Sequence, residues 1–533
     1  MKPINEGRFS PSSALHDFIG QHSGLFPGLG HFHHHQPPDS NLQFRSIDGT
    51  QNNLAQPDLN VAGTDFTRVG PANFEDGFAT PIGGANPREI SNTVVAGQGD
   101  PANPEGLSGM MYAWGQFIDH DLDLSMSDGV SHIDIAVPQG DPTFAPGTTI
   151  PLTRAVIDPA TGTPGHPATA VNSISGWLDA SMVYGSDATT AASLRMPDGH
   201  MKTSEGNNLP IVDGMFAAGD VRAAENPDLT ALQTLFVREH NYQVDRLHAA
   251  HPDWSGDQLY QNAKAIVTGE IEHITYSEFL PHLLGPDAIA PYHGYDPNID
   301  PRITEEFAGA AYRFGHSIVS AEIGQVGEQG QSLGEQDLKN AFFETPDRFN
   351  AAGSADGLLR HLAGDQSNAL DVHIVDDLRN FLSDPPDGMD LAAINIERGR
   401  DLGLGTLNET RVALGLAAYT SFDQITSDPQ TAANLATAFG SVDKVDLWTG
   451  GLAEDHVAGA MVGETFRSII GDQFEALRDG DRLWFENQGF DPKTLNMIEN
   501  TSLSDIIERN TDTAHMQSDA FVFFDRHSGT AAG

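Results

Sequence analysis

The sequence predicts a mostly α-helical protein with long loops and very little strand. Apolar residues recur at helical spacing in several long segments, strict apolar-polar alternation is almost absent, and no internal repeat is found. The 533 residues, of which 39% are hydrophobic, can bury one large core or two to three smaller ones. We expect one large helical domain over residues 41–526, between an arm at 1–40 and a tail at 527–533.

Acidic residues outnumber basic ones by 74 to 28, which gives a formal net charge of −46 at pH 7. This balance argues against nucleic acid and anionic membranes as partners, and its simplest meaning is a well-solvated surface. The chain has no cysteine. Disulfides, iron–sulfur clusters and cysteine nucleophiles are therefore excluded together.

The first forty residues are rich in Gly, Pro, Ser and His, which favours a poorly ordered arm over weak metal binding by its histidines. They contain no basic segment followed by an apolar one, and no apolar run in the chain approaches the length of a membrane span. Either export does not use the general route, or the signal is not in this sequence.

The segment 114–124 is predicted to be a helix with polar groups on one face. At 3.6 residues per turn, Gln116, Asp119 and His120 share a face, while Asp121 points elsewhere. An EF-hand is excluded, because Leu124 stands where that loop requires glycine. Taken alone, the segment fits a helix with a solvated acidic end and one satisfied histidine.

The segment 173–185 gathers side-chain oxygens. Ser175, Asp179 and Ser181 lie close in sequence, and the Trp177 carbonyl could join them. Together with a carboxylate from a remote helix, such as Asp121, these hard oxygens would suit Ca²⁺. A plain surface loop is the alternative, since Ser and Asp are common loop residues.

A long helix is predicted to begin at Pro227, with Asn226 as its N-cap. Arg222 and Glu225 stand just before this start, where a loop can direct them into a cavity. A surface ion pair of little energetic value is the alternative. Further helices are expected over 257–280, ending near Pro281, over 304–320, and over 391–403.

Five separated segments, 115–121, 175–181, 222–225, 312–316 and 395–401, match in order those of a known family. The chain resembles the animal-type haem peroxidases of the peroxidase–cyclooxygenase superfamily, from about Phe44 to about Asp525. The resemblance implies a large helical haem peroxidase domain. It also favours a haem site at the segment 114–124 over a helix with a solvated acidic end and one satisfied histidine.

The resemblance implies a role for each residue around the haem iron. His120 would be the distal base, and His316 the proximal iron ligand, with the Asn395 side-chain carbonyl accepting its N–H. Arg222 would stabilise negative charge on the leaving peroxide oxygen, and Gln116 would order pocket water or a halide.

The family also esterifies its haem through two carboxylates, which here correspond to Asp119 and Glu225. Myeloperoxidase, a member of this family, has a methionine next that forms a third link, whereas this chain has Asn226. We therefore expect haem b held by one or two esters. Bromide, iodide, thiocyanate and phenols become more suitable substrates than chloride.

The family's Ca²⁺ site corresponds to Asp121, Ser175, the Trp177 carbonyl, Asp179 and Ser181. The ion would tie that loop to the residue beside His120. Contacts to the haem propionates are expected from Asp123, Arg398 and Arg313.

The implied reaction forms an oxoferryl porphyrin cation radical from H₂O₂, which then oxidises halides, thiocyanate or aromatic donors. A fatty-acid dioxygenase is the nearest alternative, but its radical tyrosine would stand three residues before His316, where this chain has Arg313, with Tyr312 one residue off. A non-enzymatic, Ca²⁺-stabilised matrix or adhesion protein would need a broken distal set, yet Gln116, His120 and Arg222 are all present. The absence of cysteine points to a bacterial-type member and leaves its compartment open. We expect an extracellular location, and the oligomeric state is not predicted.

Overall fold

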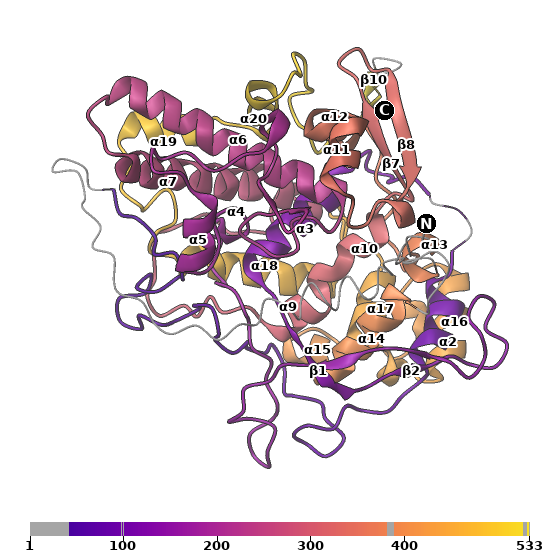
Figure 1. Ribbon diagram of the computed structural model, residues 1–533. Coiled ribbons are helices and arrows are strands. Elements are labelled where there is room, and N and C mark those ends of the chain that lie inside the picture. Colours follow the sequence, from indigo (N-terminus) through magenta and orange to yellow (C-terminus); the bar gives the residue numbers. More distant parts are fainter. Residues whose placement is uncertain (1–41, 98, 100, 381–388, 526–529, 532–533) are drawn as a thin grey trace, which may run out of the picture.

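The computed structural model describes residues 42–97, 99, 101–380, 389–525 and 530–531 (Figure 1). It is 42% helix and 11% strand, and in the described residues every sheet has two strands. The prediction of a mostly helical fold is confirmed. The arm at 1–40 lies outside the described residues, as does the tail at 527–533 apart from 530–531, so the domain boundaries stay a prediction.

Three helices form the centre of the fold: α3 (Met110–Leu122), α6 (Pro227–Ala250) and α7 (Gly256–Ile274). Figure 1 shows α6 and α7 running side by side with α3 next to them. Phe117 of α3 stacks on Phe236 of α6 with ring centroids 5.1 Å apart, and Trp114 meets Phe236 edge-on. Such aromatic pairs stabilise the packing beyond the apolar area that they bury.

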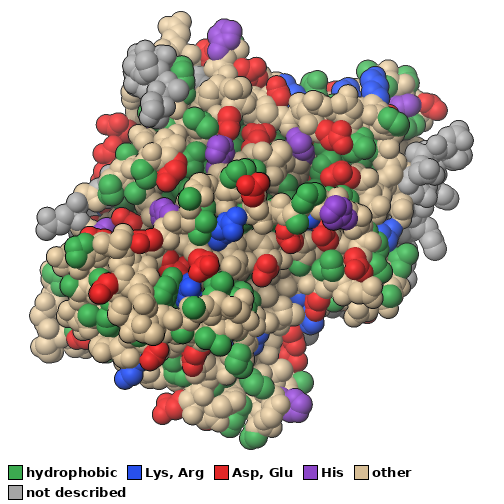
Figure 2. All heavy atoms as spheres, turned by 180° about the vertical axis from the view of Figure 1, so that it is seen from behind, with side chains coloured by type: hydrophobic (Ala, Val, Ile, Leu, Met, Phe, Trp, Pro, Cys, Tyr) green, Lys and Arg blue, Asp and Glu red, His purple; other side chains and the backbone are tan. Residues whose placement is uncertain are grey.

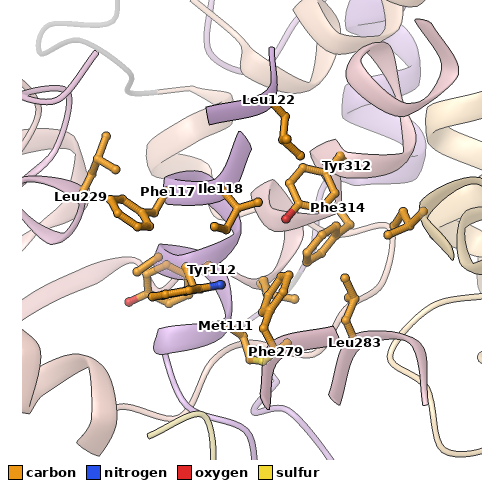
Figure 3. Close-up of a cluster of buried hydrophobic side chains, with 14 of the residues drawn as sticks. Met111, Tyr112, Phe117, Ile118, Leu122, Leu229, Phe279, Leu283, Tyr312 and Phe314 are labelled. Atoms are coloured by element: carbon orange, nitrogen blue, oxygen red, sulfur yellow. The ribbon is translucent and has the colours of Figure 1, made fainter. Parts of the chain in front are cut away.

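Eleven of the thirteen residues of α3 are buried, and the remaining two are Gln116 and Asp119. Figure 3 shows apolar side chains from several elements converging on this helix, among them Leu229, Phe279, Leu283 and Phe314. Burial of this kind contributes about 25 cal/mol for each Å² of apolar surface removed from water. The core therefore fixes the position of both polar residues.

The helix predicted over 257–280 continues past its expected end at Pro281. After α7 the chain forms a π turn over Thr275–Phe279, and α8 (Leu280–Leu284) follows, with Pro281 in its first turn. Proline is tolerated there because the first amide groups of a helix have no partner within the helix.

The helix predicted over 304–320 is broken into three pieces. α9 (Glu305–Gly309) ends at Ala310, whose φ of −142° and ψ of −66° are not helical, and a 3₁₀ turn over Ala311–Phe314 leads into α10 (Gly315–Ile318). The apolar residues that predicted one helix are nevertheless buried. The break redirects the chain just before His316.

The helix predicted over 391–403 is α14 (Leu391–Asp401), capped by Asp390, whose side chain accepts the Ala393 N–H. The other α-helices in the described residues are α2 (Pro87–Ile90), which continues as a π turn over Ser91–Val95, α4 (Ser181–Tyr184), α5 (Ala188–Leu194), α11 (Pro346–Ala352), α12 (Ser354–Gly364), α13 (Asp376–Arg379), α15 (Leu407–Ala413), α16 (Pro429–Phe439), α17 (Leu447–Ala453), α18 (Glu464–Asp479), α19 (Pro492–Ile498) and α20 (Leu503–Asn510).

The strands form short antiparallel pairs outside the helical core. The longest, β7 (Glu322–Val326) and β8 (Ser332–Asp337), make a hairpin that projects from the body in Figure 1. The others are β1 (Ser127–His132) with β4 (Thr153–Ala155), β2 (Ile135–Ala136) with β3 (Thr149–Ile150), β5 (Ile211–Val212) with β6 (Met215–Phe216), and β9 (Phe524–Asp525) with β10 (Thr530–Ala531).

Buried ion pairs tie distant loops to the core. Arg45 lies 2.6 Å from Glu272 of α7 and 2.6 Å from Asp481. The face shown in Figure 2 carries many scattered acidic side chains and few basic ones. A search of the described helices finds no segment of the length and apolarity that crossing a membrane requires.

Candidate active site

The helix α3 and the loop before α6 bring five predicted residues together. Gln116 donates from Nε2 to Glu225 Oε2 at 3.1 Å, and His120 Nε2 lies 3.8 Å from the same oxygen. Arg222 Nη1 lies 3.9 Å from Asp119 Oδ2. The residues expected on the distal side and at the ester positions therefore share one location.

On the proximal side, α10 and α14 bring His316 and Asn395 into contact, with 2.8 Å between His316 Nδ1 and Asn395 Nδ2. We expected the Asn395 carbonyl to accept the His316 N–H, and in this respect the structure differs. Arg313 Nη1 donates to the Asn395 carbonyl at 2.9 Å, so the amide nitrogen faces the imidazole. A guanidinium has only donors, and it takes the amide oxygen.

Asp119 links the two sides electrostatically. Burial raises its pKa well above the usual range, Asp123 raises it further, and both Arg222 and Arg313 oppose the shift. Arg222 belongs to the distal group, whereas Arg313 contacts Asn395 on the proximal side. The helix α10, which carries His316, also packs against α3.

These residues border an internal space. The side chains of Asp119 and Glu225 are 27% and 26% exposed, although burial raises the pKa of both carboxyl groups. Side chains that are surrounded by protein and still accessible line a recess of the site. A Cβ atom added to Gly315, beside His316, would meet nothing within 4 Å. This open space next to an imidazole suits a flat ligand.

The two histidines are held in their neutral forms. The pKa of His120 falls to about 3, mainly through burial and then through Arg222, while Asp220 opposes the shift. Burial and Arg313 lower the pKa of His316 to about 3 as well. A neutral imidazole can accept a proton or ligate a metal at neutral pH.

The sequence did not single out Asp220, and it predicted only one of the two roles of Asn226. Asp220 is buried and accepts from Arg222 Nε at 2.9 Å and from Nη2 at 3.0 Å. Asn226 caps α6 as expected by accepting the Leu229 N–H, but its Nδ2 also donates to Gln116 Oε1 at 2.8 Å. The spacing Asp-x-Arg just before the helix start was the available signal for Asp220.

The side chains expected to bind Ca²⁺ form a buried cluster. Asp121 accepts from the backbone of Asp179 and Ala180 at 3.0 Å and from Ser181 Oγ at 2.8 Å. Ser175 Oγ donates to Asp179 at 2.8 Å. The loop that carries these oxygens is thereby joined to the residue after His120.

This cluster is rich in oxygen, and the buried cations Lys264 and Arg45 act on its Asp179 carboxylate. Burial and the neighbouring Asp179 raise the pKa of Asp121 to about 7. Two carboxylates, serine hydroxyls and a carbonyl such as that of Trp177 form a donor set of the kind that Ca²⁺ takes. In the described part of the chain, no three His, Cys, Asp or Glu side chains are grouped so as to hold a metal ion.

The three residues expected to contact the haem propionates differ in the interactions that they already make within the protein. Arg398 donates to Asp401 at 2.6 Å and to the Thr153 carbonyl at 3.0 Å, so it is already engaged. Arg313 is among the cations that act on Asp119 and Asp123. Asp123 keeps a buried Oδ2 atom without a hydrogen-bond partner among the described residues. The roles of all three stay predictions.

Three comparisons with known proteins bear on this arrangement. The family model for animal haem peroxidase matches residues 44–521. Peroxinectin A of Dictyostelium discoideum is 32% identical over 90% of this chain and 96% of its own length. Lactoperoxidase of Mesocricetus auratus is 33% identical over 88% of this chain and 76% of its own length.

Solved structures of similar proteins share the fold of this chain. Peroxidase A from Dictyostelium discoideum superposes with a TM-score of 0.82 at 31% identity, covering 90% of this chain and 99% of that one. A fatty acid alpha-dioxygenase of Arabidopsis thaliana reaches 0.79 at 21% identity, covering 90% of this chain and 83% of that one, which shows a shared fold. The family match spans far more than half of the sequence. The chain therefore belongs to the animal haem peroxidase family and is a peroxidase.

Proposed function

We propose that the chain binds haem b between His120 and His316 and uses H₂O₂ to oxidise small donors, preferring bromide, iodide, thiocyanate and aromatic donors to chloride. The observation that carries this proposal is the neutral His120, with Nε2 toward the cavity and Arg222 nearby. When bound, the haem iron supplies the redox chemistry that the side chains lack.

The residues present fit a haem. His316 would ligate the iron, and the open space beside Gly315 leaves room for the flat ring. Arg313 would pair with a propionate, and Asn395 could then turn its carbonyl to the His316 N–H, which fixes the tautomer that ligates through Nε2. Asp123 and Arg398 are further propionate candidates.

On the distal side, His120 would accept the proton of the peroxide at Nε2 and return it to the outer oxygen as that oxygen leaves. Such proton transfer contributes typically about 10²–10⁴-fold in rate. Arg222 would stabilise the negative charge that develops on the same oxygen. Gln116, held by Asn226 and Glu225, would present its amide to water or to a halide.

Two carboxyl groups are available for covalent attachment. Asp119 and Glu225 are both accessible in this site, and we propose that each forms an ester with one haem methyl group, with H₂O₂ as the two-electron oxidant that removes the methyl hydrogen and is reduced to water. No methionine follows Glu225, so a third bond of the sulfonium type has no donor at that position. We assign the preference for donors that are more easily oxidised than chloride to this difference.

Ca²⁺ is the second cofactor of the proposal. Asp121, Asp179, Ser175, Ser181 and the Trp177 carbonyl would bind it. The ion would neutralise the two buried carboxylates and hold the residue next to His120. We further propose an extracellular location and the single peroxidase domain over residues 41–526.

The deciding experiment combines an absorption spectrum with oxidation assays on the purified, haem-loaded protein. We expect a Soret band, a rapid reaction with H₂O₂, and turnover of bromide, iodide and thiocyanate well above that of chloride. A haem-loaded sample that does not react with H₂O₂ would refute the proposal. Oxygen uptake with a fatty acid, in the absence of peroxide, would instead favour the dioxygenase.

A further inference from the structure

Asp220 lies between the base and the cation of the proposed site. It is 4% exposed and stands in the loop before α6. Its Oδ1 accepts from the backbone N–H of Arg222 at 2.8 Å and from Nε at 2.9 Å, and its Oδ2 accepts from Nη2 at 3.0 Å. Both oxygens of the carboxylate therefore accept hydrogen bonds from one edge of the guanidinium. This bidentate arrangement is the strong form of an Arg–carboxylate contact.

The backbone fixes where this carboxylate lies. The Asp220 N–H donates to the Met182 carbonyl at 3.0 Å. The preceding Gly219 is packed so tightly that an added Cβ would lie 2.1 Å from the Ser181 carbonyl oxygen. The loop is thus pressed against α4, which fixes the backbone of Asp220 beside Arg222.

The two ring nitrogens of His120 face different groups. Nε2 lies 3.8 Å from Glu225 Oε2, on the side of the cavity, and Nδ1 lies 3.7 Å from Asp220 Oδ1. Nδ1 is buried, and within the described residues it has no hydrogen-bond partner. Asp220 is the stronger anion of the two, because Arg222 outweighs burial and lowers the pKa of its carboxyl group, whereas burial raises the pKa of the Glu225 carboxyl group that Nε2 faces. A proton on Nδ1 that points to Asp220 is therefore favoured. The lone pair is then left on Nε2, where an acceptor is needed.

We propose that Asp220 is a positioning residue for the peroxide reaction: it selects the Nδ1–H tautomer of His120 and holds Arg222 in place. This inference rests on the proposed function and adds to it a residue that acts through two others. An ordinary turn would need only the bond from Asp220 to the Arg222 backbone. The contacts to the Arg222 side chain and the approach to His120 go beyond that need.

The test compares Asp220→Asn with Asp481→Asn, both haem-loaded. Each variant removes the charge of one buried aspartate that pairs with an arginine, but Asp481 pairs with Arg45, away from the cavity. Three reactions are measured: the rate constant with H₂O₂, cyanide binding to the ferric protein, and carbon monoxide binding to the reduced protein. Hydrogen cyanide must give its proton to a base as it binds, whereas carbon monoxide carries none.

We expect Asp220→Asn to slow the peroxide and cyanide reactions in parallel, by roughly 10- to 100-fold as for other groups that orient a functional side chain. Carbon monoxide binding should stay within about twofold, and Asp481→Asn should leave all three rates within about twofold. Unchanged peroxide and cyanide rates in Asp220→Asn would overturn the inference. So would a parallel loss of carbon monoxide binding, which indicates general loosening of the pocket.

A second comparison separates the two actions of Asp220. In an Arg222→Gln background, Asp220→Asn should still slow cyanide binding, because its action on His120 remains. No additional effect there would overturn the assignment of the tautomer. Should Asp220→Asn not retain haem, Asp220→Glu replaces it, with a smaller loss of the same pattern expected and an unchanged rate refuting it. If the native protein itself does not react with H₂O₂, the proposed function fails, and this outcome is distinct from all of these.

Discussion

Asn226 donates from its side-chain nitrogen to the carbonyl of Gln116 across 2.8 Å, while its own oxygen caps α6. One amide thus joins the start of a helix to a polar residue of the cavity. The orientation of Gln116 follows from it, because Gln116 must then direct its NH₂ group to Glu225.

Asn226→Asp should separate these two roles. Aspartate caps a helix as well as asparagine does, but it cannot donate to Gln116. We expect thermal stability close to that of the native protein and a loss of bromide and iodide turnover of about five- to tenfold, which corresponds to roughly 1 kcal/mol for one hydrogen bond. The control, Asn226→Ala, should also lose about 1 kcal/mol of stability. Equal halide turnover in Asn226→Asp would contradict the role in orienting Gln116.

His120→Ala should leave the haem bound but slow the reaction with H₂O₂ by about 10²–10⁴-fold. The reason is that His120, the neutral imidazole beside Glu225, is the base that the proposed mechanism uses. Stopped-flow absorption at the Soret band measures the rate constant. A native rate in the variant would remove His120 from the proposed mechanism.

Asp119→Val and Glu225→Gln should each remove one haem ester. Both carboxyl groups border the cavity, and the variants lack the oxygen that forms the bond. Mass spectrometry of the denatured, peroxide-treated chain should find haem retained in each single variant and released in the double variant. Equal retention in the double variant would show that the link lies elsewhere.

Removing Ca²⁺ should lower haem retention and the melting temperature together. The buried Asp121 and Asp179 would then lie near each other without the ion. At a free Ca²⁺ concentration 100 times the Kd, binding stabilises the folded state by about 2.7 kcal/mol. Calorimetry before and after chelation, with metal analysis of each sample, measures the effect. A sample that contained Ca²⁺, lost it and kept its melting curve would argue against the site.

The contribution of Asp228 to the stability of the protein should fall as the pH rises toward 8. Burial and then Asp365 raise the pKa of Asp228, in the first turn of α6, from 3.8 to about 8. The folded form therefore keeps a proton that the unfolded form has lost. The resulting stabilisation is complete below about pH 4 and is lost as the pH rises to about 8, at up to roughly 1.4 kcal/mol for each pH unit.

Asp228→Asn cannot titrate, so its melting temperature should decline less between pH 5 and pH 8 than that of the native chain. Asp287→Asn, at an exposed position, serves as the control for the change of net charge and should follow the native curve. Parallel curves for Asp228→Asn and the native chain would show that the Asp228 carboxyl group is ionised throughout this range.

Local sequence patterns predicted the parts of the fold that depend on local chemistry. Asn226 and Pro227 predicted the start of α6. The helical spacing of Gln116, Asp119 and His120 predicted that they share one face of α3. The break at Ala310 could not be predicted in this way, because the apolar spacing of 304–320 fits one helix. The non-helical backbone of Ala310 has no counterpart in that spacing.

The same distinction applies to the site. The family resemblance selected His120, Arg222 and His316, whereas Asp220 entered only when the loop before α6 was seen to turn back toward His120. The orientation of Asn395 depends on Arg313, which lies 82 residues away in sequence. Contacts of this length are decided by tertiary structure.

The burial of α3 leaves that helix no surface on which mutations could be harmless. Eleven of its residues are packed into the interior, and the two others, Gln116 and Asp119, belong to the candidate site. Every substitution in α3 therefore either weakens the packing of the core or changes a residue of the candidate site. New donor preferences are therefore less accessible to evolution, and to protein engineers, through this helix than through surface loops, which tolerate change.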